Sequence, residues 1–308
     1  MKRVLVTGGA GFIGSHLIDE LVKNYEVYSF DNHLPGFGNK HINPLAHQIS
    51  GDVRRYEDVE FAIKNIDYVI HLAAISHVSS CLNDPKLAFD VNIGGTVNIL
   101  DACRKLGTVK RIIVAGSDHI YGKNPILPAS ELNELDGLYE SDVYGQTKSM
   151  VVNISKMYYD LYDLPVVITA SGNVYSSRQS KPNMIPNWID AAIKNEPLHI
   201  HGSGNQTRDV YHIDDLVAGY IKCMETPEID GELFNFGSGN EYTINEIANE
   251  ILWLTESKSK IIHTRDTTYN AMNRMCLNVD KAKKMLNWET TMNLRNGLKK
   301  TILNWRLK

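Results

Sequence analysis

The sequence has few cysteines, no excess of positive charge and no long apolar run, and each absence excludes a class of protein. Its four cysteines stand far apart, with no Cys-x-x-Cys pair and no histidine at metal-ligand spacing, which argues against a disulfide scaffold or a metal site. The formal net charge of −4 provides no overall positive field that would gather nucleic acid or an anionic membrane. No apolar run approaches the roughly 18 residues that cross a bilayer, and the N-terminal run breaks at Thr7, too early for a signal peptide. We therefore expect a cytoplasmic protein with neither nucleic-acid nor membrane partners.

The rest of the composition is that of an ordinary folded protein. Among 308 residues, 43% are hydrophobic and 22% are charged, values that exclude disorder or coiled coil over the whole chain. The length suits one large or two interlocked domains. Internal repeats and linkers rich in glycine and serine are absent from the sequence. If the chain forms two domains, they should therefore share an extensive interface.

Short β-branched runs alternate with helical patterns through the first half of the chain, which predicts a parallel sheet with helices on both faces. The predicted strands are Val4-Leu5-Val6 and residues 26–30, 68–71, 111–114 and 166–168. From about Asn173 onward, prolines interrupt the pattern. The expected architecture is a doubly wound Rossmann domain over residues 1–172, to which some later segments return, and a smaller α/β substrate-binding lobe formed mainly by residues 173–308.

A glycine-rich turn follows the first predicted strand. Gly8, Gly11 and Gly14 stand at three-residue spacing in TGGAGFIG, and a helical run begins directly after them. Glycines at a strand-to-helix turn let the backbone approach a pyrophosphate, and the helix N-terminus offers free N–H groups. The spacing differs from Gly-x-Gly-x-x-Gly, and a tight turn without a ligand is the alternative. We predict a dinucleotide site.

Asp31 ends the next predicted strand. A carboxylate there can accept hydrogen bonds from an adenosine ribose and repel a ribose phosphate, which favours NAD over NADP. An aspartate before a turn can also act simply as a cap. Its register with the glycine turn supports the cofactor interpretation.

Tyr144 and Lys148 lie four residues apart at the start of a predicted helix, so both side chains project from one helical face. A free tyrosine with a pKa near 10 makes a poor base at neutral pH. With an effective dielectric constant of about 20, a positive charge about 6 Å away contributes about 2.8 kcal/mol. Lys148 and an oxidised nicotinamide together would then lower the pKa of the phenol by roughly three to four units. Because Tyr-x-x-x-Lys occurs by chance in many helices, the pair gains meaning only beside the glycine turn.

Taken together, these motifs resemble the extended short-chain dehydrogenase/reductase family, in particular its NAD-dependent nucleotide-sugar epimerases and dehydratases, over essentially the whole chain. Further matching stretches are Gly51-Asp52-Val53, His71-Leu72-Ala73-Ala74, Asn92-x-x-Gly95-Thr96, SDHIYG from Ser117, and residues 204–209. The resemblance implies that Tyr144 takes a proton from the sugar 4-hydroxyl, that Ser117 bonds that hydroxyl, and that Lys148 also holds the nicotinamide ribose.

The resemblance also implies a set of cofactor contacts. Asp52 and Val53 would flank the adenine, and residues 72–74 would line the cofactor channel. The implied NAD-binding residues are Gly8, Gly11, Phe12, Ile13, Gly14, Asp31, Asn32, Asp52, Val53, Leu72, Ala73, Ala74 and Asn92, together with Tyr144 and Lys148.

Members of this family diverge after oxidation at carbon 4. Asp118 and His119 follow Ser117 and look like the 4,6-dehydratase pair, although the family commonly has Asp-Glu or Asp-Lys and this chain has histidine. Imidazole has a pKa near 6.5 and can serve as the base. The stretches at residues 73–78 and 138–144 also look dehydratase-like. We expect a 4,6-dehydratase, with a 4-epimerase as the alternative and decarboxylation or simple reduction less favoured.

Two interpretations outside this chemistry remain open. His119 can be a loop histidine that faces solvent or backbone. The chain can also be a dinucleotide-binding regulator, although such a protein has no need of Tyr144, Lys148 and Ser117.

The implied substrate is a nucleoside-diphosphate sugar, and the residues matched to its binding are Ser76, Asn173, Arg178, Arg208 and Arg274. Arg208 would hold the diphosphate as a bidentate donor, unless it pairs with Asp209 or Asp214. The alignment at Arg274 is loose. The chain departs from the family at Ala170, where arginine is usual, and at Ser176-Ser177, where Gly-Pro is common.

Resemblance further suggests a homodimer through helices near residues 90–106 and 144–162. The residues Met157-Tyr158-Tyr159 then belong to a core or a dimer face. His199 and His201 share one face of a predicted strand, but no third ligand is in view, so we expect no metal there.

Overall fold

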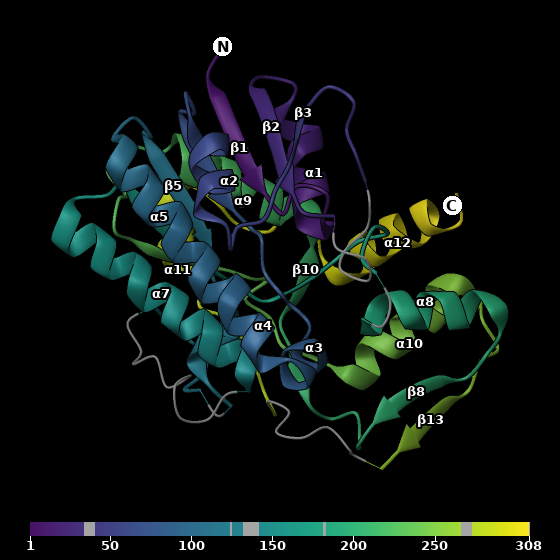
Figure 1. The fold of residues 1–308 in the computed structure, drawn as a ribbon. Helices are drawn as coiled ribbons and strands as arrows, with labels where there is room; N and C mark the ends of the chain where they lie inside the picture. Colours follow the sequence, from purple (N-terminus) through teal and green to yellow (C-terminus); the bar gives the residue numbers. More distant parts are fainter. Residues whose placement is uncertain (34–40, 124, 132–141, 181–182, 266–272, 308) are drawn as a thin grey trace.

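A parallel sheet of seven strands forms the centre of the molecule (Figure 1). The structure is a computed structural model and describes residues 1–308 except 34–40, 124, 132–141, 181–182, 266–272 and 308. The strand order is β11-β6-β5-β4-β1-β2-β3, and each neighbouring pair runs parallel. The strands are β1 (Arg3–Thr7), β2 (Glu26–Asp31), β3 (His47–Ser50), β4 (Tyr68–His71), β5 (Arg111–Ala115), β6 (Val166–Ser171) and β11 (Leu233–Phe236). The predicted doubly wound Rossmann sheet is confirmed.

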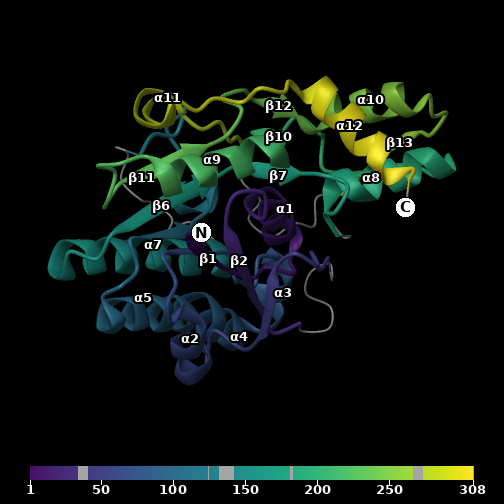
Figure 2. The same ribbon diagram turned by 90° about the horizontal axis from the view of Figure 1, so that it is seen from above.

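Helices cover both faces of this sheet (Figure 2). One face carries α2 (Tyr56–Ile63), α4 (Pro85–Phe89), the π-helical turn η1 (Asp90–Gly94), α5 (Gly95–Leu106) and α7 (Val143–Tyr162). The other carries α1 (Phe12–Leu21), α9 (Ile213–Glu225) and α11 (Asp280–Leu286). Side chains of β1 alternate between the two layers, since Leu5 belongs to one core and Val4 and Val6 to the other. Burial on both faces explains why the strands consist of β-branched and aliphatic residues.

Two strands of the sheet lie outside the sequence prediction. β3 has the mainly polar, largely exposed sequence HQIS at an edge of the sheet, so it shows no hydrophobic alternation. β11 comes from the second half of the chain and pairs with β6, with Leu233 beside Ile168. A strand contributed from so far along the sequence cannot be recognised from local pattern alone.

The remaining elements form a smaller lobe beside the carboxyl ends of the strands (Figure 1). Its helices are α8 (Met184–Lys194), α10 (Ile244–Thr255) and α12 (Leu294–Trp305), which share a separate apolar core with β8 (Leu198–His201) and β13 (Ile261–Thr264). Short pairs join β7 (Asn173–Tyr175) to β10 (Val210–His212) and β9 (Thr207–Arg208) to β12 (Tyr242–Thr243). β7 and β10 lie between this lobe and the Rossmann sheet, so they connect the two halves.

Several features noted in the sequence have plain structural outcomes. All four cysteines are free and buried. His199 and His201 are exposed on β8, and among the residues that the structure describes no three His, Cys, Asp or Glu side chains gather as metal ligands. In the same described part of the chain, no helix is both long enough and apolar enough to traverse a bilayer. Residues 138–141 of the dehydratase-like stretch lie outside the described residues.

Candidate active site

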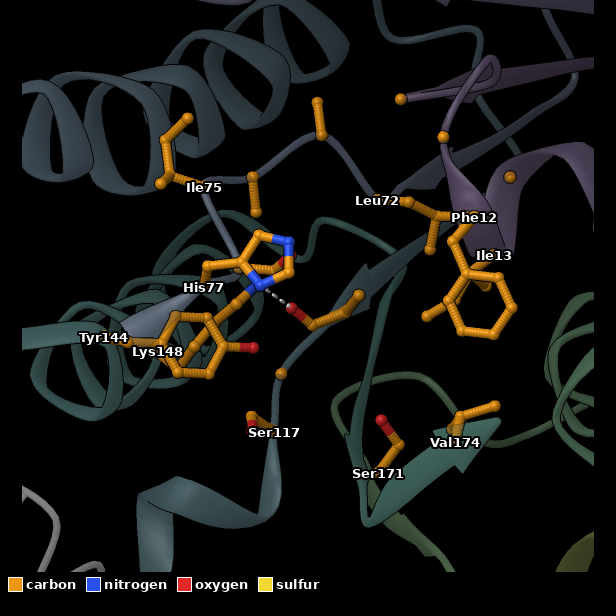
Figure 3. A pocket seen from close by; sticks show the side chains of 18 of the residues that line it. Phe12, Ile13, Leu72, Ile75, His77, Ser117, Tyr144, Lys148, Ser171 and Val174 are labelled. Atoms are coloured by element: carbon orange, nitrogen blue, oxygen red, sulfur yellow. Dashed lines mark hydrogen bonds between the residues drawn. The ribbon is translucent and has the colours of Figure 1, made fainter. Parts of the chain in front are cut away.

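A cavity of about 440 Å³ opens where the parallel strands end. Its walls come from the turns after β1, β2, β4, β5 and β6 and from the entry to the smaller lobe. Ligands of open α/β sheets bind at this edge. Figure 3 shows Tyr144 and Lys148 of α7, Ser117 after β5 and His77 after β4 extending into the cavity, with Phe12 and Ile13 of α1 lining it further along.

The glycine turn connects β1 to α1, and Gly8, Gly11 and Gly14 line the cavity. Gly8 has φ +68, a left-handed conformation that favours glycine. A Cβ atom on Gly14 would lie 2.2 Å from the Gly8 carbonyl oxygen. Gly11 caps α1 without a side-chain hydrogen bond, and the first helical turn contains no acidic residue. The N-terminus of α1 thus borders the cavity with no acidic residue in its first turn, which suits an anionic ligand.

This close approach leads to a testable expectation for Gly14→Ala. The added methyl group would overlap Gly8 O and lie 2.8 Å from the Gly9 Cα atom, so the turn must move. We expect a loss of about 1–3 kcal/mol in stability and at least tenfold weaker NAD binding, measured by thermal unfolding and calorimetric titration. Gly94→Ala is the control, because its Cβ would meet only Phe89 O at 4.0 Å. Unchanged NAD affinity in Gly14→Ala would contradict the assignment of this turn.

The carboxylate of Asp31 lies at the rim of the same turn. Its Oδ2 atom accepts a hydrogen bond from Ala10 N at 3.1 Å, and Oδ1 accepts one from His33 N at 2.9 Å. Asn32 lines the cavity and donates to Asp52 at 3.3 Å. Asp52 is not among the lining residues. Its pKa is lowered to about 2, mainly by the hydrogen bond that it accepts from Arg54. Asp31 and Asn32 thus line the cavity, whereas Asp52 contacts only Asn32 of the two.

Buried polar contacts hold the loop after β4. Thr7 Oγ1 lies 2.7 Å from His71 Nδ1 and 3.2 Å from both the Leu72 and Ala73 backbone nitrogens. Residues 72–74, which these contacts hold, line the cavity. Burial lowers the pKa of His71 to about 3, so this imidazole stays neutral and structural.

Asn92 lies outside the cavity lining. It accepts a hydrogen bond from Ile75 N at 2.8 Å and donates to Ile75 O at 3.1 Å and to Thr147 Oγ1 at 2.9 Å. This buried amide therefore ties the loop after β4 to α7. Its position suits a residue that orients the site rather than one that touches a ligand.

Tyr144 and Lys148 occupy the first turns of α7 with the spacing that the sequence indicated. Lys148 Nζ donates to Ala115 O at 2.7 Å and lies 6.0 Å from the centre of the Tyr144 ring. Burial lowers the pKa of Lys148 to about 8. Burial also raises the pKa of Tyr144 well above its ordinary value, although a hydrogen bond with Ser117 acts in the opposite direction. Burial therefore outweighs the hydrogen bond with Ser117 in setting the direction of the Tyr144 pKa shift.

Asp118 and His119 begin the 3-10 turn η2 (Asp118–Tyr121), directly after Ser117. Ser117 Oγ donates to Asp118 Oδ1 at 3.1 Å. Asp118 is only 4% exposed, and burial raises its pKa from the ordinary value despite the nearby His119 and Arg208. The His119 ring packs edge-on against Tyr144 with ring centres 5.3 Å apart. The structure thus brings an acidic group and an imidazole to the tyrosine and lysine, within one cavity.

The five predicted substrate residues divide into two groups. Ser76 and Asn173 line the cavity. Arg208 is partly buried, within electrostatic range of Asp118, and donates to its neighbour's carbonyl, Thr207 O, at 2.7 Å. Arg178 pairs with Asp19 of α1, and Arg274 pairs with Glu241 at the surface. These last two side chains are engaged away from the cavity.

The residues at the two departures from the family pattern, Ala170 and Ser176, are both buried. Ser176 is buried and its Oγ lies 2.7 Å from His16 Nε2 of α1, so this serine joins the two halves of the molecule. Ala170 is buried in β6 opposite Asn235 of β11. Neither residue lines the cavity.

Some lining residues were missed by sequence reasoning. The main ones are His77, Ser171, Ser180, Asn183 and Tyr220. The sequence could have indicated His77, because it follows Ser76 within the stretch 73–78 that was compared with dehydratases. Burial lowers the pKa of His77. Ser180 and Asn183 precede α8 in the sequence, and nothing local indicates that these two side chains line the cavity.

Known proteins with similar sequence or structure catalyse related reactions. The sequence profile of the family described as GDP-mannose 4,6 dehydratase matches residues 5–301. The chain is 33% identical to a UDP-N-acetyl-alpha-D-glucosaminuronate decarboxylase of Bacillus cytotoxicus, over 98% of this chain and 97% of that protein. Its fold is similar to that of a UDP-glucose 4-epimerase from Thermotoga maritima solved with UDP-glucose, with a TM-score of 0.93, 28% identity and 99% of each chain covered. A dTDP-glucose 4,6-dehydratase from Streptomyces venezuelae, solved with NAD bound, has a TM-score of 0.92 and 25% identity, with 99% of this chain and 97% of that chain covered.

Proposed function

The chain belongs to the NAD-dependent nucleotide-sugar epimerases and dehydratases of the extended short-chain dehydrogenase/reductase family, and within that family we propose that it is a 4,6-dehydratase of a nucleoside-diphosphate hexose. One observation carries the choice of reaction. The carboxyl group of Asp118 is buried in the cavity beside Tyr144 and His119, and burial raises its pKa from the ordinary value. Simple epimerisation at carbon 4 has no use for such an acid, whereas loss of the 6-hydroxyl as water requires one.

The residues around the glycine turn suit NAD as the cofactor. The uncapped end of α1 suits the pyrophosphate, and Asp31 suits an adenosine ribose without a phosphate. Asn32 and Val53 would contact the adenine end, and residues 72–74 and Lys148 the nicotinamide end; all of them line the cavity. When bound, NAD supplies a hydride acceptor at carbon 4 and returns that hydride at carbon 6, so that the overall reaction is redox neutral.

Tyr144, Lys148 and Ser117 form the proton-transfer group for carbon 4. Ser117 would bond the 4-hydroxyl and orient it toward Tyr144, whose phenolic oxygen takes the hydroxyl proton as the carbonyl forms. Lys148 adds a positive charge near the phenol, held in place by its hydrogen bond to Ala115 O. Tyrosine thereby acts as a base at neutral pH only in the assembled site.

Asp118 and His119 then serve the elimination. The 4-carbonyl makes the proton on carbon 5 acidic, and His119 removes it. The electron pair forms the double bond between carbons 5 and 6, the bond from carbon 6 to oxygen breaks, and Asp118 gives its proton to the departing hydroxyl. Water leaves, and the protonated His119 is positioned to return its proton to carbon 5.

The sugar nucleotide would extend from the cavity toward the smaller lobe. Ser76 and Asn173 line that route, and the partly buried Arg208 is close enough to Asp118 to lower the pKa of its carboxyl group. Arg178 and Arg274 would have to leave Asp19 and Glu241 before they could bind a diphosphate. Ser76, Asn173 and Arg208 are therefore the better placed substrate residues.

A homodimer through α5 and α7 fits the same family. The two helices lie side by side on one face of the sheet (Figure 1). Met157, Leu161 and Tyr162 of α7 are exposed in the single chain, at 41%, 66% and 50%. A second copy that packs against this face would cover them.

A product assay tests the proposed reaction. The purified protein is incubated with NAD and a panel of nucleoside-diphosphate hexoses and hexuronic acids, and the products are examined by mass spectrometry and NMR. We expect a product lighter than one hexose substrate by the mass of one water. Unchanged mass with an inverted carbon 4 would identify an epimerase instead, loss of carbon dioxide a decarboxylase, and NAD binding without conversion a regulator.

A further inference from the structure

Asp142 contacts His119 and is not among the residues that line the cavity. His119 Nδ1 lies 3.3 Å from Asp142 Oδ2, and the two side chains are 26% and 13% exposed. The same carboxylate is the N-cap of α7, since its Oδ1 atom accepts a hydrogen bond from Gly145 N at 2.9 Å. One oxygen therefore orients the helix of Tyr144 and Lys148, and the other contacts the imidazole.

We propose that Asp142 is a positioning residue that completes a carboxylate–imidazole pair with His119, so that His119 acts as the general base at carbon 5 of the sugar. The role at carbon 5 rests on the proposed dehydratase function; the pairing rests on geometry alone. Nothing in the family pattern of Asp-Glu or Asp-Lys at this turn anticipates such a pair.

The contact determines which ring nitrogen is the base. With a carboxylate oxygen at Nδ1, this nitrogen carries the hydrogen, and Nε2 retains the lone pair. The edge-on contact with Tyr144 limits rotation of the ring, with planes at 75°. His119 lines the cavity, so Nε2 is the nitrogen left to accept the proton from carbon 5.

The surrounding charges also favour the imidazolium that forms when the proton is taken. The charged or titratable groups that face His119 are Asp118 of η2, Asp142 and Tyr144 of α7 and Arg208 of β9. Burial lowers the pKa of His119 and Arg208 lowers it further, but the interactions with its acidic neighbours, first among them the hydrogen bond to Asp142, outweigh both, so the pKa is raised. A base whose pKa lies nearer to neutral pH transfers protons efficiently in both directions.

Asp142→Asn separates the electrostatic role from the capping role. Asparagine caps helices about as well as aspartate and retains an oxygen for Gly145 N, but it carries no charge beside the imidazole. We expect the pKa of His119 to fall by about one unit, measured by NMR titration of histidine labelled at the imidazole carbons in the full-length protein. The His119 signal is assigned as the one missing in His119→Gln.

The activity of the same variant provides the second readout. The limb of the pH–rate profile for water loss that belongs to His119 should move to lower pH together with the NMR pKa, and the rate on the plateau above this limb should fall severalfold, because a weaker base accepts the proton less readily. Asp84→Asn is the matched control: Asp84 caps α4 through Leu87 N at 2.9 Å, lies outside the cavity lining, and should change neither readout.

Two outcomes would overturn the inference. One is a His119 pKa that is the same in wild type and Asp142→Asn. The other is a neutral imidazole with its hydrogen on Nε2 in the wild type. A wild-type protein that releases no water from any sugar would refute the dehydratase proposal. The titration would still decide the pairing of Asp142 with His119, because the NMR measurement needs no turnover.

Discussion

Replacement of Tyr144 by phenylalanine is expected to lower turnover by roughly 10²-fold or more. The substitution removes only the phenolic oxygen that takes the proton from the 4-hydroxyl. Lys148 keeps its hydrogen bond to Ala115 O, and the ring keeps its contact with His119. The affinity for NAD should therefore change little, because the glycine turn and Lys148 are untouched. Steady-state kinetics and calorimetric titration of the cofactor measure the two quantities.

Tyr158→Phe is the matched control for this substitution. Tyr158 belongs to the same helix, packs beside Tyr162 with ring centres 5.4 Å apart, and does not line the cavity. Its loss of a hydroxyl should leave turnover within about twofold of wild type. Wild-type turnover in Tyr144→Phe would show that the phenol does not take part in proton transfer, and the mechanism built on it would fail.

The second large effect is expected from Asp118→Asn. Asparagine has the size of aspartate and can still contact Ser117 Oγ, which lies 3.1 Å from Asp118 Oδ1. It has no proton to give to the departing hydroxyl, so water loss should slow by roughly 10²-fold or more. Oxidation at carbon 4 should continue, because it depends on Tyr144 rather than on the acid. Rapid mixing with substrate would then show the reduced cofactor by its near-ultraviolet absorbance without release of water.

Asp118→Asn also makes a distinct prediction for pH dependence. Two groups that must be in opposite protonation states produce a bell-shaped rate profile whose limbs belong to the pair. In Asp118→Asn, the limb that reports the protonation of Asp118 should disappear, and the limb that reports the protonation of His119 should remain. A variant that loses water at the wild-type rate, or that retains both limbs, would contradict the assignment of Asp118 as the acid.

The elements with strong local signals were predictable from the sequence. β1, β2, β4, β5 and β6 are short aliphatic runs bounded by helical patterns, and all five were identified. β3 was missed because it is a polar edge strand, and β11 because it joins the sheet from the smaller half of the chain. Edge exposure and long-range pairing leave no periodic pattern that a local interpretation can use.

The candidate site divides in the same way. The glycine turn with Asp31, and the pair Tyr144 and Lys148, depend on neighbours only a few residues away, so spacing alone indicated how they would lie. The same sequence reasoning placed Arg178 toward the substrate, whereas the side chain pairs with Asp19 of α1. It had no basis on which to join His119 to Asp142, because these two lie on separate elements.

By itself, the sequence determined the chemical types present and their local order: a phosphate-binding turn, an acidic residue after the second strand, a tyrosine and lysine on one helical face, and an Asp-His pair after a strand. Only the tertiary structure decided which of these groups share a cavity, which charges are buried, and which carboxylate faces the imidazole. The physical reason is that backbone geometry follows from nearby residues, whereas the pKa and orientation of a side chain depend on burial and on partners that folding brings from distant parts of the chain.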